Sequence, residues 1–129
     1  MIRVRHWIKR GCPRSKLVVG IPTYGRSWTL SSSTSTAIGS PASGAGSPGP
    51  VTKEGGFLAY NEICQKIQKG DFTKVSDPTN KMGPYAHGAR QWVGYDDPAM
   101  AGLKAQYILD QRLGGAMFWD LPSDDFRNK

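Results

Sequence analysis

The chain lacks any apolar run approaching the roughly 20 residues that a membrane-spanning helix requires. Its N-terminus carries arginine and lysine but no apolar segment of the kind found in signal peptides. We therefore expect either a cytosolic protein or a secreted one whose native start lies elsewhere. The sequence also lacks internal repeats, and its 129 residues predict one compact domain or a piece of a larger one.

Acidic residues are missing from the first sixteen positions, although the chain as a whole has a formal net charge of +7. The basic residues there are Arg3, Arg5, Lys9, Arg10, Arg14 and Lys16. A basic helix can bind phosphate groups, but no nucleic-acid-binding motif accompanies this one, and Trp7 alone is no stacking platform. We interpret it as a solvated helix face and do not expect nucleic acid or a membrane as a partner.

Cysteine is scarce as well, with only Cys12 and Cys64. One pair cannot define a disulfide framework, and no spacing resembles a metal site. A Cys12–Cys64 disulfide and two free thiols both stay open. We expect no metal and no cofactor.

Two short apolar runs, Lys16–Trp28 and Gly114–Asp120, stand out from this background. Neither alternates with polar residues, which is typical of strands buried on both faces of a parallel sheet. Each ends in groups suited to binding: Tyr24, Arg26 and Trp28 in the first, Trp119 and Asp120 in the second. Ligands lie at the C-terminal ends of parallel strands, so the pattern predicts a sugar-like or other planar, hydroxyl-rich ligand.

The other segments follow from turn and helix signals. They are a helix over 3–11 that ends at Gly11, a flexible Ser/Thr/Ala/Gly/Pro linker or insertion over 31–50, a helix from an N-cap at Thr52 to Gly70, a loop over 71–81, a hairpin of 84–87 with 91–95, and a helix from an Asp97 N-cap to about Arg112. This order predicts an α/β fold with an α+β insertion between two buried strands. Two parallel strands alone make no stable sheet, so we expect part of a larger barrel or sheet.

Four segments carry a family resemblance: KLVVGIPTYGRSWTL, GSPGPVTKEGGFLAYNEIC, QWVGYDD and GGAMFWDLPSDDF. The chain resembles the C-terminal part of chitinases and chitinase-like proteins of glycoside hydrolase family 18. The resemblance implies an incomplete TIM (β/α)8 barrel that consists of its last two βα units, with the chitinase insertion domain between them. The implied parts are a partial barrel over 1–30, the insertion domain over 31–95 and a second partial barrel over 96–129.

The resemblance also implies sugar-binding roles. Trp119 matches the tryptophan that floors the subsite of the cleaved sugar, and Met117 lies beside it. Tyr24 and Arg26 match residues that hydrogen-bond sugar hydroxyl or N-acetyl groups, and Glu62 matches a carboxylate that reaches into the groove from its wall.

Each role has a plainer alternative. Trp119 is then a core tryptophan, Met117 packs a barrel, Arg26 pairs with an acid such as Asp96, and Glu62 is a solvated helix residue. We expect Trp92 and Tyr95 to pack the hairpin against the helix, although Trp92 could also touch a distal sugar.

The family's acid motif, DxxDxDxE, is absent from the chain. In the family its glutamate protonates the glycosidic oxygen while the substrate's acetamide attacks the anomeric carbon. We therefore assign no catalytic residue. Asp120 stands where the family usually has a small residue. The family partner of Cys64, a cysteine just after the DDF segment, is absent too.

We therefore predict a C-terminal fragment of a secreted, extracellular chitinase-type protein that contributes half of a groove for chitin or chito-oligosaccharide. Only a full-length parent would hydrolyse chitin, with retention. The alternative is a fragment of a non-catalytic chitinase-like lectin or growth-factor-like protein.

Overall fold

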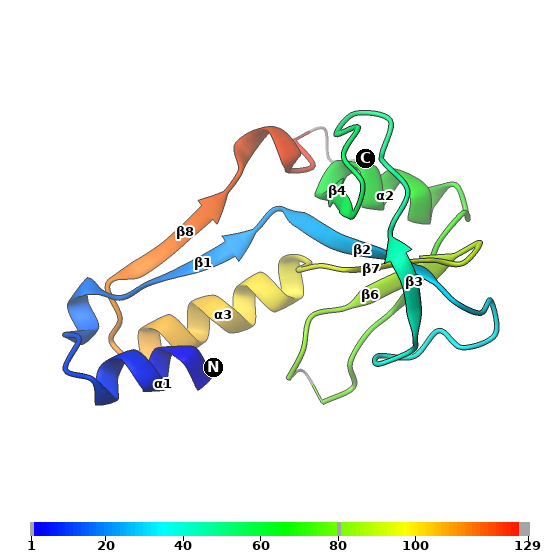
Figure 1. Ribbon diagram of the computed structural model, residues 1–129. Helices are drawn as coiled ribbons and strands as arrows, with labels where there is room; N and C mark the ends of the chain where they lie inside the picture. The colour runs from blue at the N-terminus through cyan, green and yellow to red at the C-terminus, as the bar shows by residue number, and fades with distance from the viewer. Residues whose placement is uncertain (1, 80, 127–129) are drawn as a thin grey trace.

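The computed structural model describes residues 2–79 and 81–126 and has an α/β fold (Figure 1). Its α-helices are α1 (Ile2–Lys9), α2 (Tyr60–Gln68) and α3 (Pro98–Asp110), with short 3-10 helices η1 (Arg14–Lys16) and η2 (Leu121–Ser123). Its strands are β1 (Val18–Pro22), β2 (Tyr24–Leu30), β3 (Ala42–Ala45), β4 (Phe57–Ala59), β5 (Thr73–Val75), β6 (Tyr85–Gly88), β7 (Gln91–Gly94) and β8 (Gly115–Trp119). Within the described residues these strands form two sheets.

The two apolar runs pair as parallel strands. β1 lies beside β8, in a register that runs from Val18 opposite Gly115 to Pro22 opposite Trp119. We call these two strands the strand pair; α3 extends alongside them in Figure 1. The expectation of burial on both faces is wrong, because Val18 is 56% exposed and Phe118 53% exposed. A single helix cannot cover a sheet on two sides, and no other described element does so.

The larger sheet holds the remaining strands in the order β3-β2-β7-β6-β5, all antiparallel, with β4 also paired to β2. One face packs against α2. The core there consists of Leu58, Ile63, Phe72, Ala86, Val93 and Tyr95. The opposite face, which we call the open face, carries no helix among the described residues. The larger sheet therefore contains the principal hydrophobic core.

The helix expected from Thr52 begins only at Tyr60. Positive φ angles at Lys53 (53°) and Gly56 (79°) turn the backbone before it, and such angles are incompatible with a right-handed helix. Phe57, expected on that helix, lies on β4 instead.

The stretch over 31–50 is not a flexible linker. It contains β3, which pairs with β2, and the Trp92 Nε1–H donates to the Thr36 carbonyl oxygen at 3.2 Å. The loop expected over 71–81 contains β5, and its Asn80 lies outside the described residues. β3 consists of the small residues Ala-Ser-Gly-Ala and β5 is only three residues long, so neither edge strand gives an apolar signal in the sequence.

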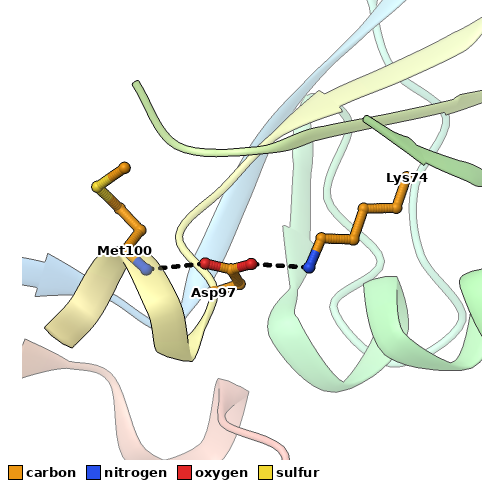
Figure 2. Close-up of polar contacts among 3 residues, drawn as sticks. All are labelled: Lys74, Asp97 and Met100. Atoms are coloured by element: carbon orange, nitrogen blue, oxygen red, sulfur yellow. Dashed lines mark hydrogen bonds and ion pairs between the residues drawn. The ribbon is translucent and has the colours of Figure 1, made fainter. Parts of the chain in front are cut away.

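Two other predictions are confirmed. The hairpin consists of β6 and β7, joined by Ala89 and Arg90 in left-handed conformation. Asp97 caps α3, because its Oδ1 accepts a hydrogen bond from the Met100 N–H at 2.9 Å. Figure 2 shows that the other Asp97 oxygen bonds to the Lys74 Nζ of β5, at 2.7 Å.

The chain passes from the strand pair to the larger sheet at Thr23. The Thr23 N–H donates to the Trp119 carbonyl oxygen at 2.9 Å, and the Thr23 carbonyl oxygen accepts from the Tyr60 N–H at 3.0 Å. β2 therefore belongs to the larger sheet, whereas the family resemblance groups residues 1–30 into one partial barrel. The division of the chain into domains stays a prediction. Cys12 and Cys64 are both free thiols, so no disulfide joins them.

Candidate functional site

The open face of the larger sheet carries Tyr24 and Arg26 at alternate positions of β2. Because side chains alternate along a strand, the intervening Gly25 is buried on the other face, towards α2. The Tyr24 ring stacks on the Phe57 ring, with a centroid distance of 4.8 Å and an interplanar angle of 27°. The Arg26 guanidinium lies over both rings, 5.4 Å from each centroid. This packing holds the guanidinium in place by cation–π contact.

Arg26 does not form the ion pair with Asp96 that the alternative interpretation proposed. Asp96 instead bonds to the Lys104 Nζ of α3. Arg26 is exposed, and within the described part of the chain it has no ion pair. Its N–H donors therefore remain available to a ligand.

A hollow of about 430 Å³ opens beside these groups, and we call it the inner hollow. Its lining includes Pro22, Tyr24, Arg26, Tyr85, Trp92 and Asp96. Aromatic rings with a few polar groups are typical of a ligand-binding surface.

Trp119 lies at the end of β8, opposite Pro22, which itself lines the inner hollow. The Trp119 side chain is 65% exposed, so the alternative of a core tryptophan is wrong for this chain. Met117 lies two residues earlier, on the same side of the strand pair, and is 46% exposed. A Cβ on Gly20 would lie 3.6 Å from the Met117 Cε, an ordinary van der Waals distance, so the Met117 side chain lies against Gly20 of β1. The fold thus brings Trp119 and Met117 to the end of the sheet where Tyr24 begins.

Glu62 lies elsewhere than expected. It is only 1% exposed, so it neither reaches into the inner hollow nor lies in solvent. Its Oε1 accepts hydrogen bonds from the Val51 and Thr52 N–H groups at 2.7 and 3.2 Å. Its Oε2 accepts from the Ala59 N–H and the Thr52 Oγ1, both at 2.9 Å. A ligand could reach this carboxylate only by displacing these bonds.

The hydrogen bonds keep Glu62 ionised. Burial by itself raises the pKa of this carboxyl, but the backbone bonds from Ala59, Val51 and Thr52 outweigh it, and the pKa is lowered below its ordinary value. Glu62 is a structural residue that fastens the segment before β4 to α2.

Sequence reasoning missed Phe57 and Tyr85 on the open face. The signal was alternation, since Tyr85 and His87 flank the buried Ala86, just as Trp92 precedes the buried Val93. Trp92 does not pack on the helix; it stacks on Tyr85 at 5.2 Å and 20°, on the open face. Tyr95 is buried, and its ring lies 6.1 Å from that of Tyr60 on α2, as expected.

Among the described residues, no group of His, Cys, Asp and Glu side chains is arranged to hold a metal ion. The helices that the structure describes are all too short or too polar to cross a membrane.

Fold and site together define a class: an α/β protein whose uncovered aromatic rings and available guanidinium suit a ligand with apolar faces and polar edges. The chain belongs to glycosyl hydrolases family 18, whose family model matches residues 2–124.

Individual relatives agree with this assignment. Chitinase-3-like protein 2 of Homo sapiens is 48% identical over 126 residues, which are 98% of this chain and 31% of that protein. The crystal structure of Ostrinia furnacalis Group II chitinase catalytic domain 2 superposes with a TM-score of 0.94 at 41% identity, over 98% of this chain and 33% of that one. Human YKL-39, described as a pseudo-chitinase with retained chitooligosaccharide binding properties, has a TM-score of 0.88 at 46% identity, over 97% of this chain and 33% of that one. The chain thus spans about a third of the length of these relatives.

Proposed function

We propose that this chain binds β-1,4-linked N-acetylglucosamine chains, as chitin or chito-oligosaccharide, and forms one side of their groove. The observation that carries the proposal is that the backbone of Thr23, next to Tyr24 in the chain, bonds to the backbone of Trp119, whose side chain is exposed. An exposed indole can pack against the apolar face of a pyranose ring, while a guanidinium donates to hydroxyl and acetamide oxygens. Met117 would extend the apolar surface beside Trp119.

Glu62 is not part of this proposal as a direct ligand. Its role would be indirect, because it accepts hydrogen bonds from the Val51 and Ala59 backbones. The segment between them contains Phe57, whose ring supports Tyr24 and Arg26.

Within a full-length parent, β1 and β8 would be the last two strands of a (β/α)8 barrel and the larger sheet would be the insertion domain. Hydrolysis with retention would then depend on a DxxDxDxE acid that this chain does not contain. An extracellular parent stays part of the proposal, in keeping with a family that acts on extracellular polysaccharide.

A second candidate is a non-catalytic chitinase-like lectin. One observation favours it: human YKL-39, to which the chain is similar, is described as a pseudo-chitinase with retained chitooligosaccharide binding properties. Both candidates share the binding surface and differ only in the acid motif.

Retention on chitin beads tests the shared part. The chain should bind, and Trp119→Ala should weaken binding about tenfold through loss of the stacking surface. Trp7→Ala is the matched control, since Trp7 is 57% exposed on α1, away from the groove. Equal retention of the Trp119→Ala form and the unsubstituted chain would refute the stacking argument.

A further inference from the structure

The row of side chains on β2 does not end at Arg26. Trp28 follows at the next alternate position, and the intervening Ser27 is buried, so Trp28 shares the open face with Tyr24 and Arg26. Trp28 lies four positions after Tyr24 on the strand, or about 13 Å away along it. The row thus extends away from Trp119 along one strand.

Trp28 is held in place and yet uncovered. Its ring centroid lies 5.7 Å from that of Trp92, which is opposite it on β7, with an interplanar angle of 59°. Trp92 is fixed in turn by its stack on Tyr85 and its bond to the Thr36 carbonyl. Despite this support the Trp28 side chain remains 43% exposed.

Small residues explain the exposure. On the other side of β2, Trp28 pairs with Ala45 of β3. A second hollow, the outer hollow, of about 610 Å³ lies there, lined by Arg26, Trp28, residues 42–45, Gly55 and Gly56. No large side chain of this lining covers the indole.

The two hollows adjoin at Arg26, which lines both. We propose that Trp28 is an outer stacking platform for sugar units of the same chain that lie beyond those held by Tyr24, Arg26 and Trp119. The inference rests on the function proposed above and deepens it, because it makes binding depend on the length of the oligosaccharide. Trp92 is a positioning residue that holds the indole.

The chemical groups that line the outer hollow indicate which ligand it would bind. A guanidinium beside an indole offers donors for hydroxyl groups and a flat apolar face for a ring, and the outer hollow has no carboxylate in its lining to bind a cation. Because Arg26 lines both hollows and Tyr24, Arg26 and Trp28 lie on one strand, the distal part of one sugar chain fits better than a separate ligand.

Titration of the full 129-residue chain with N-acetylchito-disaccharide and N-acetylchito-hexasaccharide tests the proposal. Trp28→Ala should weaken hexasaccharide binding about tenfold and change disaccharide binding by less than about twofold. Trp28→Phe should retain most of the hexasaccharide affinity, because it keeps an aromatic face. Trp28→Leu preserves apolar packing against Trp92 without a flat ring and should also weaken hexasaccharide binding about tenfold, which keeps the test decisive if the alanine form does not fold.

Trp7→Ala serves again as the exposed-tryptophan control and should change neither affinity. Equal losses for both sugars in Trp28→Leu, or no loss for either, would overturn the inference and leave the proposed function standing. A changed oligomeric state in Trp28→Leu with unchanged hexasaccharide affinity would also overturn it, since the face would then serve a second copy of the chain. Absence of binding of either sugar by the unsubstituted chain would refute the proposed function and this inference together.

Discussion

Glu62→Gln should destabilise the chain although it changes only one atom type and one charge. Oε1 and Oε2 of Glu62 together accept bonds from three backbone N–H groups and one hydroxyl. The glutamine amide has one oxygen and one NH₂ group, so in either orientation at least one backbone N–H faces another donor. A buried, unsatisfied donor costs about 2 kcal/mol. At about 4 °C per kcal/mol for a chain of this size, the melting temperature should fall by about 8 °C at pH 7.

The effect should shrink in acid. The folded-state pKa of Glu62 is lowered below its ordinary value, so ionised Glu62 contributes its full stability above the ordinary glutamate pKa of about 4.3. That contribution is lost as the pH falls through the lower, folded-state pKa. The glutamine variant has no such titration, so the difference between the two melting temperatures should be smaller at about pH 3 than at pH 7.

Thermal unfolding followed by circular dichroism measures both effects. Glu54→Gln is a matched control, because the chain's other glutamate is exposed and should melt with the unsubstituted chain. A Glu62→Gln form that melts within about 1 °C of the unsubstituted chain at pH 7 would refute the reasoning, because the bonds to Val51 and Ala59 would then carry no stability.

Two further pairs of substitutions test neighbouring contacts by the same thermal unfolding. Asp97→Ala removes the cap of α3 and should cost about 1 kcal/mol. Lys74→Met should cost less than about half of that, because the Lys74 side chain is 40% exposed and exposed ion pairs stabilise little. A larger loss from Lys74→Met than from Asp97→Ala would contradict this order. Gly49→Ala should cost about 2 kcal/mol, because the added Cβ would overlap the Glu62 carboxylate. Gly44→Ala, with no atom within 4 Å of its added Cβ, should be nearly neutral. Similar melting temperatures for the two variants would contradict this, because the backbone at Gly49 would then move aside without cost.

Apolar runs and caps predicted the parts of the fold that local chemistry determines. The parallel pairing of β1 with β8, the β6–β7 hairpin and the Asp97 cap all follow from patterns of a few residues. Family resemblance was needed to predict sugar-binding roles for Trp119, Tyr24 and Arg26; the structure shows that the end of β8 bonds to Thr23, next to Tyr24.

The sequence-based predictions that were wrong concerned features that depend on contacts between distant segments. Composition made residues 31–50 a linker, because small side chains have no periodic apolar signal, yet backbone pairing holds β3 against β2. The role of Glu62 could not be found either, since its partners Val51 and Thr52 lie ten or eleven residues earlier and converge on it only after the turns at Lys53 and Gly56. Positive φ at a lysine is rare enough that sequence gives no warning of it.

The proposed site depends on how the two sheets are joined, because Tyr24 and Arg26 lie on the sheet that has its own core and Trp119 lies on the strand pair that does not. Thr23 makes the junction. Besides its backbone bonds to Trp119 and Tyr60, its Oγ1 donates to the Asp120 carbonyl oxygen at 2.5 Å, and the residue is only 8% exposed. One buried threonine thus fixes the end of β8 relative to β2 and α2. The backbone at Trp119 is consequently placed relative to Tyr24 by these bonds, whereas the Arg26 guanidinium is held by its contacts with the Tyr24 and Phe57 rings.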